Sequence, residues 1–100
     1  MIQIENIKLG DRIVQGVSLS APGGEGHPNM LVLQCDKGYI MCGYLNLDTA
    51  NAVEDAAAVV SGSCFDDILA NPVKAVSTKA QELGVTVGMT GRQAAEALSR

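Results

Sequence analysis

Aromatic residues are nearly absent from this chain of 100 residues, which has no tryptophan, one phenylalanine (Phe65) and two tyrosines (Tyr39 and Tyr44). Hydrophobic residues make up 47% of the chain, so its core must consist of Val, Ile, Leu, Ala and Met. A chain of this length forms one domain, residues 1–100, and buries roughly 65% of its extended surface on folding. We therefore expect a thin core and, because apolar faces can be shared between copies, a homo-oligomer.

Basic residues are also scarce, with seven Lys and Arg against eleven Asp and Glu and a formal net charge of −4. Nucleic-acid binders need a basic surface and, for single strands, stacking aromatics, so no nucleic-acid partner is expected. The chain has no run of about 18 apolar residues, which argues against a membrane span. Residues 1–5 lack the features of a signal peptide, so we expect a cytoplasmic location.

Histidine occurs once, at His27, and the three cysteines (Cys35, Cys42 and Cys64) show no C-x-x-C spacing. These absences argue against a zinc site, a redox motif and a Cys–His or Ser–His–Asp catalytic arrangement. The carboxylates show no recurring ligand spacing, so no metal is expected and the cofactor is unknown. In a reducing cytoplasm the thiols should be free.

The first half of the chain has the alternating pattern of β-strands. Two hairpins are predicted, the first joining residues 2–8 to 12–19 and the second joining residues 30–35 to 39–44. Asp36-Lys37-Gly38 is predicted to be the turn of the second hairpin, with Gly38 free to take a positive φ. The intervening segment, residues 20–29, has three glycines and two prolines and is predicted to be a mobile loop.

The second half mixes helical and strand patterns. Capping residues, helical spacing and β-branched runs predict six segments in this order: helix 46–55 capped by Asn46 or Asp48, strand 56–60, helix 64–70 with a capping box from Ser63 to Asp66, helix 72–83 ended by Gly84, strand 85–87, and helix 90–98 with a capping box from Thr90 to Gln93. The fold class is therefore α+β, with one mixed, largely antiparallel sheet of five or six strands and three or four helices packed mostly on one face.

Cys42 is the first candidate site residue, because it ends a buried strand and is followed by Gly43. A site at such an edge is held by a rigid strand, and Gly43 would let ligand atoms approach the backbone. A following helix that points its N-terminus at the thiol would favour the thiolate. The alternative is that Cys42 is a small buried apolar residue. Cys64, at a helix start beside Asp66, is a weaker candidate.

The segment Thr90-Gly91-Arg92 is the second candidate. The start of a helix offers free N–H groups, Thr90 adds a hydroxyl, and Arg92 adds a guanidinium that can hold a carboxylate or phosphate. The alternative is a capping box followed by a surface arginine.

Two stretches of the chain resemble the YunC-like family, a bacterial and archaeal domain of unknown function. The resemblance is carried by Gly38-Tyr39-Ile40-Met41-Cys42-Gly43 and by Leu83-Gly84-Val85 through Gly88-Met89-Thr90-Gly91-Arg92, with Asp67-Ile68-Leu69 and Pro72 between them. It implies a small mixed α/β domain over residues 1–100 and no established activity. The segment Ala21–His27 is longer than the family pattern, which argues against His27 as part of a shared site.

Two functions fit these observations, and the sequence does not decide whether the protein is an enzyme. The first is a protein that binds a small anionic ligand, or a thiol-dependent enzyme, with Cys42 as the candidate catalytic residue and Gly43, Thr90, Gly91 and Arg92 as ligand-binding residues. The second is a non-catalytic homo-oligomeric structural or interaction domain.

Overall fold

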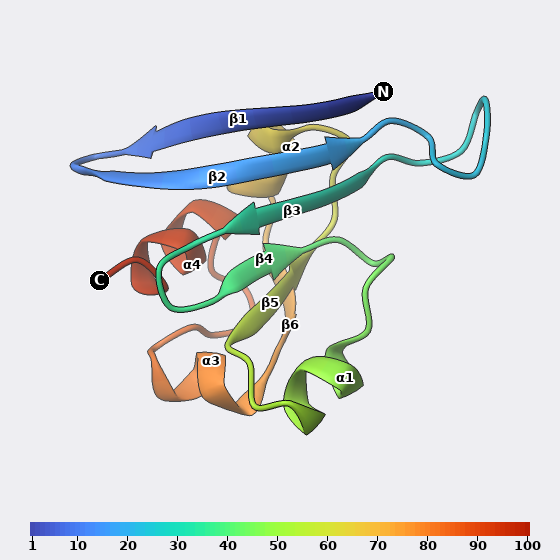
Figure 1. Ribbon diagram of the computed structural model, residues 1–100. Helices are drawn as coiled ribbons and strands as arrows, with labels where there is room; N and C mark the ends of the chain where they lie inside the picture. Colours follow the sequence, from blue (N-terminus) through green and yellow to red (C-terminus); the bar gives the residue numbers. More distant parts are fainter.

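The computed structural model describes residues 1–100 and has one sheet of six strands that lie side by side in chain order. The strands are β1 (Ile2–Leu9), β2 (Arg12–Leu19), β3 (Met30–Gln34), β4 (Tyr39–Met41), β5 (Ala57–Val60) and β6 (Val73–Val76). The helices are α1 (Leu47–Ala52), α2 (Phe65–Ala70), α3 (Thr78–Glu82) and α4 (Gly91–Ala97). Figure 1 shows the strands as successive arrows from β1 at the edge to β6.

Every neighbouring pair of strands is antiparallel except β4 and β5, which are parallel and joined through α1. The predicted α+β fold with a mixed, largely antiparallel sheet is therefore confirmed. The first four strands form the expected meander of two hairpins, although β4 ends at Met41, so residues 42–44 of the predicted strand 39–44 lie outside it. In the first hairpin Leu9 pairs with Arg12, and Gly10 takes a φ of 63° in the two-residue turn, a conformation that costs glycine little.

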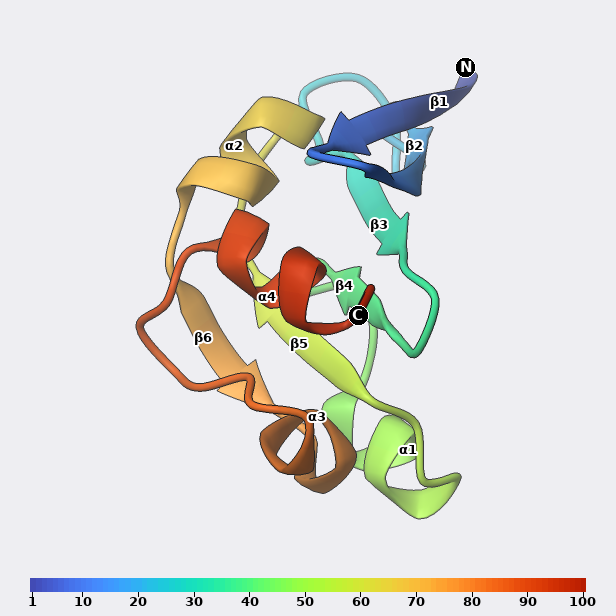
Figure 2. The same cartoon turned by 90° about the vertical axis from the view of Figure 1, so that its left-hand side faces the viewer.

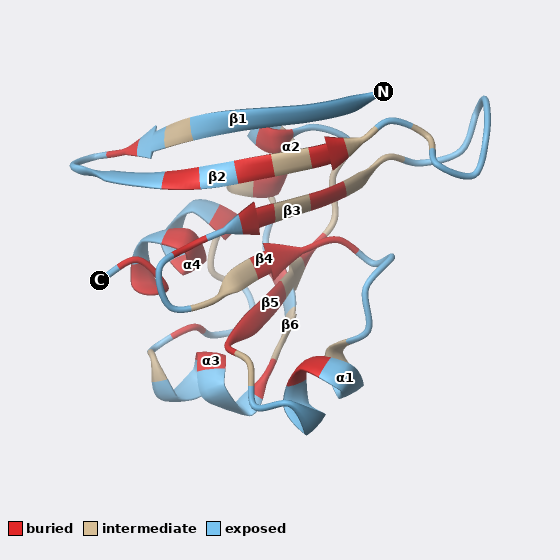
Figure 3. Cartoon of the chain, viewed as in Figure 1, coloured by how far each residue is buried: buried red, intermediate tan, exposed pale blue.

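The two faces of the sheet are covered unequally. The main core, which includes Leu33, Ile40 and Val60, lies between one face and helices α2, α3 and α4. A small second cluster of Met41, Ala50 and Ala57 joins the opposite face to α1. Figure 2 shows α2 and α4 on one side of the sheet, and Figure 3 shows the buried residues concentrated in the middle strands and on the inner surfaces of the helices.

The predicted caps are confirmed at three helix ends. The Asn46 side chain accepts a hydrogen bond from the Asp48 N–H at the start of α1. Thr90 and Gln93 form the complete capping box of α4, which begins at Gly91. Gly84 follows α3 with a φ of 95°, in the left-handed region that favours glycine at a helix end.

Two segments differ from their predicted structures. The predicted helix 72–83 is wrong in its first half, since Val73–Val76 is strand β6 and α3 begins only after Ser77. Val73 and Val76 have the spacing of an apolar stripe on a helix, which is why the sequence predicts a helix. In the structure this short β-branched segment pairs with β5, and the pairing decides that it forms a strand. The predicted strand 85–87 is also wrong: the segment is irregular and leads into a turn that begins at Val87, although Val85 is fully buried.

Two local expectations were also wrong. Gly38 does not have a positive φ; it is glycine because a Cβ there would overlap the carbonyl oxygen of Ala56. At the start of α2 the cap residue is Cys64, and the carboxylate of Asp67, rather than Asp66, accepts bonds from the N–H and hydroxyl of Ser63 at 3.1 and 3.0 Å. These bonds hold the pKa of Asp67 below its usual value.

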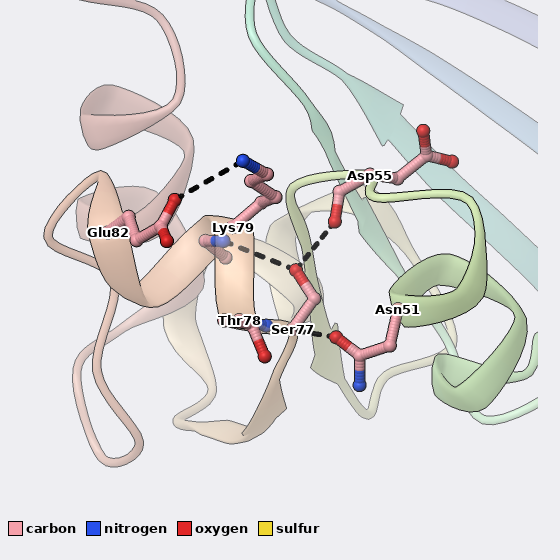
Figure 4. A network of polar contacts seen from close by, with 7 residues as sticks. Asn51, Asp55, Ser77, Thr78, Lys79 and Glu82 are labelled. Carbon is pink, nitrogen blue, oxygen red and sulfur yellow. Dashed lines mark hydrogen bonds and ion pairs between the residues drawn. The ribbon is translucent and has the colours of Figure 1, made fainter.

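A buried serine ties α3 to the beginning of β5. The Ser77 hydroxyl accepts hydrogen bonds from the N–H groups of Ala57 and Ala80, at 2.9 and 3.2 Å, and donates to the carbonyl oxygen of Asp55 at 2.8 Å. Next to it, the Thr78 N–H donates to the side chain of Asn51 in α1 at 2.9 Å (Figure 4). One hydroxyl therefore satisfies three backbone groups, which lie in β5, in α3 and in the segment just before β5.

Candidate functional site

A hollow of about 570 Å³ lies at the carboxyl ends of the two parallel strands, β4 and β5. Cys42 and Gly43 follow β4, and Ser61 and Gly62 follow β5, so both chain segments leave the sheet at the same place. All four residues line the hollow. The ends of adjacent parallel strands are common ligand sites because the chain must open there to cross over the sheet.

The thiol of Cys42 is held at the base of this hollow by β3. The Leu31 N–H donates a hydrogen bond to Cys42 Sγ at 3.3 Å, and the Cys42 N–H donates to the Leu31 carbonyl at 3.1 Å. Cys42 is only 5% exposed and contributes to the main core, yet it lines the hollow. The predicted candidate is thus both a packing residue and a wall of the site.

The glycine-rich loop between β2 and β3 forms the rim of the hollow and is fixed at two points. The Asn29 side chain accepts from the Ala21 N–H and donates to the Ser63 carbonyl, both at 2.9 Å. The Tyr44 hydroxyl donates to the Pro28 carbonyl at 3.2 Å. As a result His27, Pro28 and Asn29 line the same hollow as Cys42. The sequence offered no signal for this, because His27 lies 15 positions before Cys42 on an irregular segment.

The lining of this hollow contains no carboxylate, although the chain has eleven Asp and Glu residues. Each of the other three hollows of the structure has at least two acidic residues in its wall. The N–H groups of Gly43 and Gly62 bond to no acceptor within the chain, and Asn29, Ser61 and His27 add polar side chains. Chemically, the hollow offers hydrogen-bond donors and a thiol without negative charge.

The largest hollow, about 730 Å³, lies elsewhere, between α1 and the outer surface of β3 and β4. Its wall includes Tyr39, whose hydroxyl donates to the carboxylate of Asp55 at 2.8 Å, and the further acids Asp36 and Glu54. Size favours this hollow, but it contains none of the candidate residues and its three carboxylates disfavour an anion. We therefore place the candidate site at Cys42.

Tyr39 should ionise late. Burial, the hydrogen bond to Asp55 and the charge of that carboxylate together raise the pKa of Tyr39 to about 12, from an ordinary value of 10. A pKa raised in the folded state means that the linked stability is complete below pH 10 and is lost as the pH rises through 12.

In Tyr44→Phe protein, where only Tyr39 absorbs, the absorbance at 295 nm should report the midpoint of Tyr39 ionisation. Adding Asp55→Asn should lower it, whereas Glu54→Gln, in the same wall, should change it less; an unchanged midpoint in Asp55→Asn would contradict the assignment.

The other two cysteines are placed differently. Cys35 is buried, which raises the pKa of its thiol to about 11; the neighbouring Ser99 hydroxyl lowers it and the charge of Asp36 raises it further. Cys64 is exposed at the start of α2. None of the three cysteines forms a disulfide, and no group of three or more His, Cys, Asp and Glu side chains is placed to hold a metal ion.

The second predicted segment, Thr90-Gly91-Arg92, lines none of the four hollows. The Thr90 hydroxyl accepts from the Gln93 N–H at 3.1 Å, and the Gly91 N–H donates to the Asn71 carbonyl at 2.9 Å. The Arg92 side chain is exposed and forms no ion pair with any residue of the chain. The structure therefore gives Thr90 and Gly91 structural partners and leaves Arg92 available.

Taken together, the fold is a small α+β domain with a hollow at the carboxyl ends of its one parallel strand pair. Residues 41–98 match the family described as Domain of unknown function (DUF1805). The chain belongs to this family. It is 35% identical over 99 residues to the "Uncharacterized protein YunC" of Bacillus subtilis (strain 168), a match that covers 94% of each chain.

A solved structure has the same fold. The "Crystal Structure of a Protein of Unknown Function TA1206 from Thermoplasma acidophilum" matches with a TM-score of 0.89 and 34% sequence identity, over 99% of this chain and 94% of that one. The resemblance seen at Cys42-Gly43 and Thr90–Arg92 is thus confirmed at the level of the family. None of the helices has the length and apolar character needed to cross a membrane.

Proposed function

We propose that this protein binds a small anionic ligand in the hollow around Cys42, and that it acts in the cytoplasm, where its thiols stay reduced. The observation that carries the proposal is the absence of any carboxylate from that hollow in a chain of net charge −4. Unpaired backbone N–H groups at Gly43 and Gly62 would donate to the anion, and His27 at the rim would add positive charge when protonated.

The proposal also includes a possible reaction at the thiol of Cys42. In a thiol-dependent reaction Cys42 Sγ would be the nucleophile, the Leu31 N–H would stabilise its thiolate, and His27 would be the candidate base. In a binding protein without catalysis the same thiol would be a polar contact. Arg92 stays a candidate ligand residue, from the family motif and its free guanidinium, although it lies outside this hollow.

The charge preference of Cys42 tests the proposal directly. Native protein is alkylated with iodoacetate, an anion, or iodoacetamide, its neutral counterpart, and each cysteine is quantified by mass spectrometry. Relative to Cys64, which has Asp66 and Asp67 beside it, Cys42 should prefer iodoacetate by about tenfold, because an anion is held at one site and repelled at the other. His27→Gln should reduce the preference, and Arg92→Ala should reduce it only if Arg92 belongs to the site.

Two results of the alkylation experiment would contradict the proposal. If Cys42 reacts with neither reagent until the protein unfolds, its thiol contributes only to packing, and a thiol-dependent reaction at Cys42 is excluded. If it reacts with both reagents in the same ratio as Cys64, the hollow has no preference for anions. Circular dichroism of each variant checks that the fold is intact.

A further inference from the structure

One face of the sheet is left without a covering layer. Strand register places alternate side chains of β1, β2 and β3 on the face opposite α2 and α4. We call this set the outer face, and its apolar members are Ile2, Ile4, Ile13, Val17, Leu19 and Val32. Ile2, Ile4 and Ile13 are 68, 64 and 61% exposed. Helix α1 covers only the part of this side that lies over β4 and β5, and Figure 3 shows the exposed length of β1.

We infer that the outer face packs against the outer face of a second copy of this chain, sheet on sheet. This inference is independent of the Cys42 hollow. A contiguous apolar patch surrounded by polar residues is typical of a protein interface. Two sheets pack face to face about 10 Å apart with their strands nearly aligned, so each outer face would supply the missing layer of the other.

The charges on this surface favour a second copy. The protein is acidic, yet the outer face has no acidic side chain: Glu5 has the opposite parity, on the side of α2. Over β1 and β2 two copies can therefore approach without like-charge carboxylate pairs, since the acidic hollow beside α1 borders the face only at Val32 and Gln34 of β3. The one charged residue of the face, Lys8, lies at the hairpin end. A two-fold axis with antiparallel strands separates the two lysines to opposite ends of the interface, which fixes the orientation.

The size of the face indicates a weak, reversible dimer. With strands about 4.8 Å apart and about 3.4 Å per residue, three strands of up to eight residues cover on the order of 400 Å² in flat projection. Projecting side chains make the accessible area larger, so it approaches about 600 Å² per partner, the lower end for specific interfaces. We therefore expect dissociation in the micromolar range.

The free edge of β1 offers a competing arrangement. In a two-residue hairpin the pair Leu9 and Arg12 is hydrogen-bonded, and Ser20 bonds to Met1 at the other end, so the backbone groups of Ile2, Ile4, Asn6 and Lys8 point away from β2. The far edge is partly covered, since Val73 in β6 exchanges hydrogen bonds with Gly88 and Met89. Edge pairing through β1 would leave the apolar face exposed, and we therefore favour packing through the face.

Sedimentation velocity from 1 to 300 µM tests the inference on the full chain. The wild type should approach twice the 10.4 kDa mass of one chain as its concentration rises. Ile13→Lys should weaken the dimer at least tenfold, and Ile4→Lys provides a second variant. The matched control is Val87→Lys, since Val87 is equally exposed at 61% but lies far from the face in the turn before α4. Asn6→Pro removes an outward N–H of β1 and so tests the edge; because the Asn6 side chain also lies on the outer face, Asn6→Ala, which keeps the N–H, is its control.

Three results would overturn the inference. The first is a wild type that remains a monomer at 300 µM, and the second is an Ile13→Lys variant that associates as strongly as Val87→Lys. The third is a dimer that Asn6→Pro abolishes and Ile13→Lys leaves intact, which would show that the copies meet through their edges. Neither result bears on the alkylation of Cys42, so the two proposals fail separately.

Discussion

Gly91→Ala should destabilise the protein by about 3 kcal/mol, measured as the free energy of unfolding in urea. A Cβ at Gly91 would overlap the carbonyl oxygen of Ile68 in α2. The clash is with backbone, so no side-chain rotation relieves it, and α4 must move away from α2. That movement would also strain the hydrogen bond from the Gly91 N–H to Asn71.

Gly43→Ala is the matched control for this substitution. A Cβ at Gly43 would meet no atom within 4 Å, and its φ is not positive. Its effect on stability should therefore stay within about 0.5 kcal/mol, as at ordinary surface positions. Equal costs at the two glycines would contradict the assignment of Gly91 as a packing contact. Both glycines belong to the family motif, so the comparison separates a structural glycine from one beside the proposed ligand site.

Ser77→Ala should also cost about 3 kcal/mol. The substitution leaves the N–H groups of Ala57 and Ala80 and the carbonyl of Asp55 without their partner at a position that is fully buried. An unsatisfied buried polar group costs about 1–3 kcal/mol, and the lost helix cap adds to this. Urea denaturation monitored by circular dichroism would measure the change.

Thr78→Ala is the neighbouring control. Thr78 is exposed and contributes only its backbone N–H to the network, through the bond to Asn51. Removing its hydroxyl should change the free energy of unfolding by less than about 0.5 kcal/mol. If Ser77→Ala behaved like Thr78→Ala, water would have replaced the hydroxyl, and the link from α3 to β5 would not depend on it.

The site and the outer face use different parts of the same sheet. The hollow lies at the carboxyl ends of β4 and β5, where the only parallel connection opens the chain. The outer face belongs to β1–β3. A dimer formed through this face would therefore leave the hollow around Cys42 open, so ligand binding and association can be measured independently.

Local patterns were sufficient for much of the fold. Alternation in residues 2–19, with a glycine in the turn, determined the first hairpin because its partners are close in sequence and its turn is short. Thr90 and Gln93 determined the start of α4, since a capping box needs only residues within one helical turn. The alternating pattern also placed Cys42 and Gly43 near the end of a strand, and in the structure they directly follow β4.

Tertiary structure decided what depended on distant partners. Val73–Val76 became a strand because β5 lies beside it, an interaction absent from a local pattern. Gly38 and Gly91 are required by the approach of Ala56 and Ile68, which local turn rules do not describe. His27 reached the wall of the Cys42 hollow only because hydrogen bonds at its rim fix the loop. The sequence by itself determined the first four strands, three of the helix caps and the candidate thiol. The packing of the chain decided which residues surround that thiol, because spatial neighbours depend on sheet order and not on spacing.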